Sequence, residues 1–179
     1  WPALAVLAPI DLPSDTLHFA VPDDRKPLAS AIDKALARIT PQQRLAYELK
    51  WLGTSSAPIR HEGRVPLTID EQVWLAGIRP PRLGYPHTWE PVSFADENGR
   101  ISGIAGEYVH MMERGLGLRL QKEIPVSIED LLDLMRRDQV DIVPIPAAAP
   151  LGPEWTRTIA FAHLGNVIIT RNGTRAISG

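Results

Sequence analysis

The chain has 179 residues, a formal net charge of −2 and 44% hydrophobic residues, so it is long enough to bury a core. Its basic residues are dispersed, which argues against a nucleic-acid surface. It has no cysteine, as in many periplasmic and cytosolic proteins, and no apolar run approaches the roughly 20 residues that span a bilayer. Because the chain starts at Trp1 with no signal-peptide pattern, we expect it to be part of a longer precursor.

The apolar pattern of the first 53 residues predicts two strands followed by two helices. Short apolar runs bounded by proline and aspartate predict strands at Leu4–Leu7 and Leu17–Val21. The period then changes, and a helix starting at Lys26 is predicted by the apolar face of Leu28, Ile32, Ala35, Leu36 and Ile39. Thr40 and Gln43 predict the capped start of a second helix that ends at Gly53, with an apolar stripe of Leu45, Leu49 and Leu52 beside Trp51.

Residues 54–66 have no apolar period and predict a linker. A capping box of Thr68 and Glu71 then predicts a short helix over Leu67–Leu75 that is anchored by Trp74 and Leu75.

An alternation of strands and helices follows the linker. We expect strands at Arg82–Tyr85, Leu118–Val126 and Val140–Ile145, and a turn at Asp96–Gly99. Between them we expect a helix with the buried face Ile104, Tyr108, Met111 and Met112, and a Ser127-capped helix with the buried face Leu131, Leu132, Leu134 and Met135. One helical turn is predicted at Glu154–Thr158, and short strands are predicted at Ile159–Ala162 and Asn166–Thr170. The alternation predicts a parallel sheet that binds ligands beyond the carboxyl ends of its strands, near the segment Tyr85–Phe94.

The order of several short segments resembles the periplasmic solute-binding protein family 3. The resemblance covers about residues 78–172 and rests on Trp89–Phe94, Asp96–Gly99, Gly103–Glu107 and Leu116-Gly117. It implies an α/β fold, namely a periplasmic binding protein type II-like lobe whose mostly parallel sheet has helices on both faces. This lobe would be incomplete on its own.

Residues 17–53 resemble the closing strand and terminal helices of the same family. The chain is therefore interpreted as the C-terminal strand and helices of a first Venus-flytrap module (1–53), a linker (54–66) and the first lobe of a second module (67–179). We further hypothesise that the strand Leu17–Val21 inserts into the sheet of residues 82–170, because that sheet would otherwise expose an edge. Phe19 would then lie close to the strand Val140–Ile145.

The module order resembles the tandem sensors of BvgS-type hybrid histidine kinases. It implies a non-catalytic ligand-sensing region in the periplasm, within a dimeric two-component sensor kinase anchored in the inner membrane. Its partners would be a small-molecule ligand and the remaining lobes of the receptor. The alternative is the solute-binding protein of an ABC importer for amino acids or other small polar solutes. An enzyme ranks third, because no pair of carboxylates has a convincing acid–base context.

The candidate ligand-binding residues are Tyr85, His87, Trp89, Glu90, Ala147, Ala148 and Trp155. The resemblance implies an arginine six residues before Phe161 to hold a ligand carboxylate, but Trp155 stands there. Trp89 is either a stacking residue or a packing residue, and His87 is either a pH sensor or an exposed loop residue. No catalytic residue, cofactor or metal site is predicted, because the five histidines show no i,i+4 pair and there is no phosphate-binding glycine motif.

Overall fold

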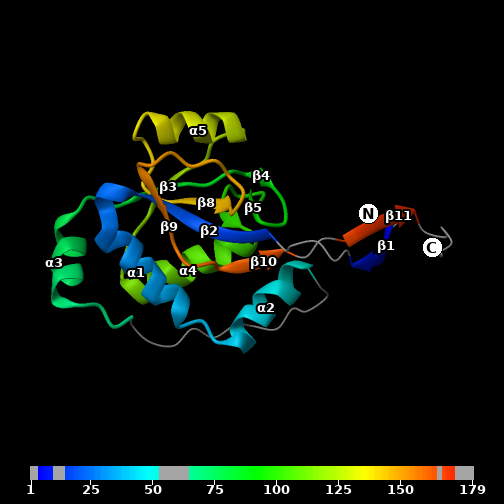
Figure 1. The fold of residues 1–179 in the computed structure, drawn as a ribbon, viewed down its shortest axis with the longest axis horizontal. Helices are drawn as coiled ribbons and strands as arrows, with labels where there is room; N and C mark the ends of the chain where they lie inside the picture. Colours follow the sequence, from blue (N-terminus) through cyan, green and yellow to red (C-terminus); the bar gives the residue numbers. More distant parts are fainter. Residues whose placement is uncertain (1–3, 10–14, 53–64, 165–166, 172–179) are drawn as a thin grey trace.

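The computed structural model describes residues 4–9, 15–52, 65–164 and 167–171, which form the mixed α/β fold of Figure 1. The helices are α1 (Lys26–Ala37), α2 (Pro41–Leu52), α3 (Ile69–Gly77), α4 (Ile104–Leu116) and α5 (Ile128–Arg136), and a short 3-10 helix, Asp23–Arg25, precedes α1. The strands are β1 (Leu4–Pro9), β2 (Asp15–Pro22), β3 (Arg82–Gly84), β4 (Thr88–Trp89), β5 (Ser93–Ala95), β6 (Ile101–Ser102), β7 (Gln121–Glu123), β8 (Val143–Pro146), β9 (Trp155–Arg157), β10 (Ala162–Leu164) and β11 (Val167–Arg171).

The central strands form a mixed sheet, so the expectation of a mostly parallel sheet is wrong. β3 pairs with β7 in parallel, and a parallel bridge between Leu83 and Ile142 joins β3 to the residues that precede β8. β2, in contrast, pairs antiparallel with β8, β9 and β10. The difference arises because β2 comes from the N-terminal segment and crosses the sheet in the opposite direction to β8.

The insertion of the N-terminal strand is confirmed. Phe19 of β2 lies opposite Pro144 of β8, and Leu17 lies opposite Pro146. A four-stranded sheet therefore contains strands from both sides of the predicted linker. Gly53 and most of the predicted linker lie outside the described residues, so the division into two modules stays a proposal.

β2 supplies side chains to clusters on both faces of the sheet, because successive side chains of a strand point to opposite faces. Leu17, Phe19 and Val21 are fully buried in the larger cluster, which also holds the buried faces of α1 and α4. Ala20 belongs to a second cluster with Leu131 and other residues below α5. Helices thus cover both faces, as predicted, with α5 on one side of the sheet and α1 and α4 on the other (Figure 1).

Three of the predicted helix starts are confirmed by their capping hydrogen bonds. Thr40 and Gln43 exchange hydrogen bonds of 2.9 and 3.2 Å, and Thr68 and Glu71 form a full capping box. The hydroxyl of Ser127 accepts from the backbone N–H of Asp130 at 3.0 Å. These starts were predictable because a capping pair lies within four residues and needs no distant partner.

The predicted apolar face of α2 is wrong. Leu45 and Leu49 are 53% and 42% exposed, whereas Tyr47 is fully buried. The ring of Tyr47 lies 4.9 Å from that of Tyr108 on α4, and Trp51, one turn later, packs against the core. The aromatic residues thus direct α2 toward α4, and the leucines turn outward.

Two other segments also differ from expectation. The predicted helical turn at 154–158 is the strand β9, because the edge of β2 provides backbone partners for Trp155, Thr156 and Arg157. The predicted strand Leu118–Val126 is regular only over Gln121–Glu123. No helix in the described ranges is long and apolar enough to cross a membrane.

Phe19 offers a direct test of the importance of β2. Its ring stacks on Phe161 with centroids 4.6 Å apart. We expect Phe19→Ala to lower the free energy of unfolding by about 3–5 kcal/mol, through lost burial and a cavity. Leu45→Ala, on the exposed side of α2, should change it by less than about 0.5 kcal/mol. Urea denaturation measures both; equal effects would contradict a central role for β2.

Candidate ligand-binding groove

An apolar groove of about 380 Å³ lies between α5 and the segments at the carboxyl ends of β3 and β8. Its walls come from β4, α5, β8 and the loop that follows β8. The lining residues are Thr88, Trp89, Ile128, Leu131, Leu132, Met135, Pro144, Ile145, Pro146, Ala149, Pro150 and Leu151. The volume is in the range that accommodates a small molecule, and the groove is at the edge of the sheet where the sequence predicts a ligand.

The floor of the groove depends on close contact between α5 and the sheet. Gly84 ends β3 directly below Leu131, and a Cβ atom at Gly84 would lie only 2.7 Å from the Leu131 Cδ1 atom. A larger residue at position 84 would therefore force the Leu131 side chain to move. Leu131 and Met135 are buried and hold α5 to the sheet, whereas Ile128 and Leu132 remain 44% and 36% exposed at the groove. One apolar helix face thus serves both packing and the groove.

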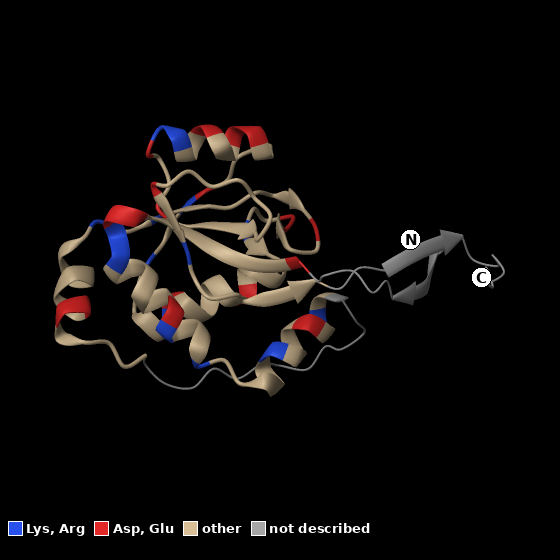
Figure 2. Ribbon diagram, viewed as in Figure 1, with Lys and Arg blue, Asp and Glu red and all other residues tan. Residues whose placement is uncertain are grey.

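The groove contains almost no polar chemistry. None of its described lining residues is charged, and their side chains offer only the Thr88 hydroxyl and the Trp89 indole N–H. In the ribbon of Figure 2, β4 and β8 carry no charged residue, and the charged residues nearby lie on α5 and on the loops that follow β4 and β5. The groove can therefore bury apolar surface but cannot neutralise a ligand charge.

Three of the candidate residues lie at or beside the groove. Trp89 lines it directly, held on β4 by pairing with Ser93 of β5. Ala147 and Ala148 are exposed in the loop whose next residue, Ala149, lines the groove. The backbone N–H of Ala147 donates to the carbonyl oxygen of Thr16 at 2.7 Å, which ties this loop to β2.

The other four candidates do not line the groove. Tyr85 is fully buried and its hydroxyl donates to the Ser102 carbonyl oxygen. His87 Nδ1 lies 2.8 Å from the Pro125 carbonyl oxygen, and Glu90 is exposed. Trp155 lies on β9, where it packs against the cluster below α5.

The position of Arg157 bears on whether the groove can bind an anion. Its Nη2 atom donates to the carbonyl oxygen of Ala149, from the side of the loop that faces β9. Arg157 is exposed and is not among the lining residues. It therefore braces one wall of the groove and does not supply a charge to its interior.

The groove residues of α5 and of the prolines around β8 were not among the candidate ligand-binding residues. Leu131, Leu132 and Met135 were assigned to a buried helix face, as their spacing indicates. One usable signal was present, because Ile128 and Leu132 add apolar residues to this helix beyond the buried Leu131 and Met135. Both of these additional residues line the groove.

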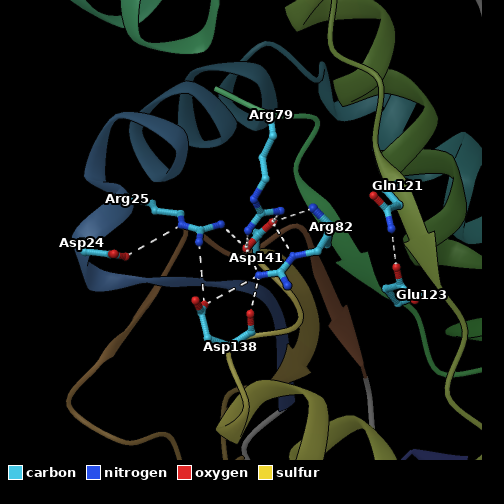
Figure 3. A network of polar contacts seen from close by, with 8 residues as sticks. All are labelled: Asp24, Arg25, Arg79, Arg82, Gln121, Glu123, Asp138 and Asp141. Carbon is cyan, nitrogen blue, oxygen red and sulfur yellow. Dashed lines mark hydrogen bonds and ion pairs between the residues drawn. The ribbon is translucent and has the colours of Figure 1, made fainter. Parts of the chain in front are cut away.

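The opposite edge of the sheet holds a charged cluster centred on the buried Asp141 (Figure 3). Arg79 forms a two-pronged contact with its carboxylate at 2.9 and 3.1 Å, and Arg82 donates from its Nη2 and its backbone N–H at 2.9 and 2.7 Å. Arg25, which precedes α1, forms a further ion pair with it. Burial alone would raise the pKa of Asp141, but the hydrogen bonds from Arg82 and Arg79 and the charge of Arg25 outweigh it and lower the pKa to about 2.

This Asp141 cluster joins three segments and does not resemble a binding site. Its arginines come from the 3-10 helix before α1, the segment after α3 and the first residue of β3. Asp138 lies near Arg25 and Arg82 at 3.7 Å, so the acidic and basic groups largely balance. Across the described part of the chain, no group of three or more His, Cys, Asp or Glu side chains is placed to hold a metal ion.

Comparisons with known proteins give weak likenesses. No family model matches the sequence, and no curated protein matches it. One similar solved structure is the MppA periplasmic murein tripeptide binding protein in its unliganded open form, with 17% identity and a TM-score of 0.41 over 80% of this chain. Another is a substrate-binding protein from Microbacterium hydrocarbonoxydans complexed with 4-hydroxybenzoate hydrazide, with 16% identity and a TM-score of 0.39 over 81% of this chain. The chain spans 30% of the length of each, and no family assignment follows.

Removing the carboxylate of Asp141 should destabilise the fold strongly. Asp141→Ala leaves three arginines around an empty site, and we expect a loss of about 3–5 kcal/mol in the free energy of unfolding. The control is Asp133→Ala, which removes exposed ion pairs to Arg136 and Arg137 and should cost less than about 1 kcal/mol. Similar costs in urea denaturation would show that the buried cluster contributes no more than a surface pair.

The lowered pKa of Asp141 predicts a pH dependence of stability. Its folded pKa of about 2 is below the ordinary value of 3.8, so its contribution is complete above about pH 5 and is lost as the pH falls toward 2. We expect the contribution of Asp141 to the free energy of unfolding to fall by about 2 kcal/mol over this range of pH. Comparison of the wild type with Asp141→Asn at pH 6 and pH 2.5 isolates this contribution from other carboxylates. The stability difference between the two proteins should shrink at low pH, and a constant difference would contradict the assignment.

Proposed function

We propose that this chain forms one ligand-binding lobe of a periplasmic sensor protein, in which binding of a small molecule at the groove beside Trp89 is the signal input. The observation that carries the proposal is the groove itself, with a volume of about 380 Å³ at the carboxyl ends of β3 and β8. In α/β sheets this edge is the usual place for a ligand. The proposal assigns the chain a binding role without catalysis.

The strand connections support a second lobe on the groove side. The carboxyl ends of β8 and β10 and the amino end of β2 share one edge of the sheet, because both strands pair antiparallel with β2. The chain continues from that edge to β1 and β11, which pair with each other and lie on one side of the lobe in Figure 1. The start of β2 and the end of β10 thus lie at the groove edge of the sheet, which is where this proposal places a further lobe.

In this proposal, ligand binding shifts the equilibrium between an open and a closed pair of lobes. A sensor histidine kinase of a two-component system, dimeric and anchored in the inner membrane, would read that shift. The binding protein of an importer would use the same groove. The two functions differ in the partner that the closed state contacts, which is the kinase in a sensor and the permease in an importer. A ligand that alters autophosphorylation of the complete parent protein would favour the sensor, and uptake that depends on a permease would favour the importer.

Trp89 provides the test of the binding site. Solutes that raise the melting temperature of the chain should lose this effect in Trp89→Ala, because the indole forms one wall of the groove. The matched control is Trp74→Ala on α3, which also removes a partly buried indole but lies outside the groove. Melting curves without solute establish that both variants fold. If shifts survive Trp89→Ala or vanish equally in the control, the groove is not the binding site.

A further inference from the structure

We infer that the groove selects an uncharged molecule with a planar ring, and not an amino acid or another charged solute. This inference rests on the proposed function and names the ligand class of the same groove. It follows from three features of the walls, which are their lack of charge, their rigidity and the position of Arg157.

The lack of charge makes a zwitterion a poor ligand. A charged group that leaves water needs an opposite charge or several hydrogen bonds, and none of the described lining residues is ionisable. The polar side-chain groups among the lining residues, the Thr88 hydroxyl and the Trp89 N–H, are neutral and suit a neutral hydroxyl, carbonyl or ring nitrogen on a ligand. The groove therefore fits a mainly apolar molecule with at most a small polar substituent.

The shape of the walls favours a flat ligand over a flexible chain. Trp89 contributes an aromatic face, and Pro144, Pro146 and Pro150 contribute rigid rings. Pro144 and Pro146 are further fixed by the pairing of β8 with β2. A planar ring can stack on such surfaces without loss of its own conformational freedom, whereas a flexible chain would have to be ordered.

Arg157 bears on the choice between a neutral ring and an aromatic anion. One of its N–H groups donates to the Ala149 carbonyl oxygen, but its side chain is exposed and does not line the groove. An anion inside the groove would therefore lack a charged partner among the described lining residues. The geometry thus points to a neutral ligand.

The test uses three probes that share one ring system, namely 5-fluoroindole, 5-fluoroindole-3-acetate and 5-fluorotryptophan. Ligand-observed fluorine NMR with the full chain measures the Kd of each, and 1-hexanol serves as a flexible competitor. We expect fluoroindole to bind at least about tenfold more tightly than the other two probes, the factor expected when one charge lacks its partner. Hexanol should displace it poorly.

Two variants locate the binding. Leu132→Glu places a charge in the groove at a residue that is already 36% exposed, and it should weaken fluoroindole binding at least about tenfold. Val73→Glu is the control at a 68% exposed residue on α3 and should leave binding unchanged. Arg157→Gln tests the alternative of an aromatic anion, because loss of its charge would weaken the binding of fluoroindole-acetate if Arg157 held the carboxylate.

The outcomes separate this inference from the proposed function. If fluorotryptophan or fluoroindole-acetate binds best and Leu132→Glu or Arg157→Gln weakens it, the groove is a binding site and the ligand class inferred here is wrong. If hexanol competes as well as fluoroindole itself, the preference for a planar ring is wrong. If no probe binds, the ligand class is overturned, and the melting experiment with Trp89→Ala decides the proposed function. If a probe binds but Leu132→Glu leaves its Kd unchanged, the groove is not the binding site and both the ligand class and the proposed function are overturned.

Discussion

The insertion of β2 between β8 and β10 is the constraint on which this lobe depends. Its backbone pairs with β8, β9 and β10, all of which come from residues after position 140. Its side chains alternate between the core below the sheet, through Phe19, and the cluster below α5, through Ala20. The groove depends on it as well, because the prolines of its wall sit on β8 opposite Leu17 and Phe19. The first part of the chain thus shapes a site whose lining residues all lie in the later part.

The two edges of the sheet use opposite chemistry. At the amino edge, Asp141 and its three arginines fix where α1, α3 and β3 converge. Such a cluster is costly to bury and costly to break, which makes it a specific way to join segments. At the carboxyl edge, the lining residues carry no charge and α5 leaves part of its apolar face open. The amino edge is thus held by buried ion pairs, whereas the carboxyl edge offers apolar surface to a ligand.

Local patterns predicted local features of this fold well. The capping pairs at Thr68 and Ser127 and the buried face of α4 are as expected, because each depends on residues within a few turns. The orientation of α2 could not be predicted from the sequence, because its leucine face and its Tyr47–Trp51 face are both apolar enough to be buried. The contact between Tyr47 and Tyr108 of α4 determines that the aromatic face is the buried one. β9 was missed for the same reason, because its partner is a strand more than 130 residues earlier. Trp89 and its edge of the sheet were predicted from the resemblance, but the apolar wall from α5 was not, because spacing cannot distinguish a buried leucine from one that borders a cavity.

The two roles of α5 couple stability to specificity in this lobe. Leu131 and Met135 touch both the sheet and the groove, so a change at either residue would alter the fold and the site together. Ile128 and Leu132 lie one turn apart on the open part of the same face and contribute little to the cluster below the helix. Ligand preference could therefore change through these two positions without loss of the core. Gly84 limits this freedom, because a side chain there would meet the Leu131 Cδ1 atom and force Leu131, which lines the groove, to move.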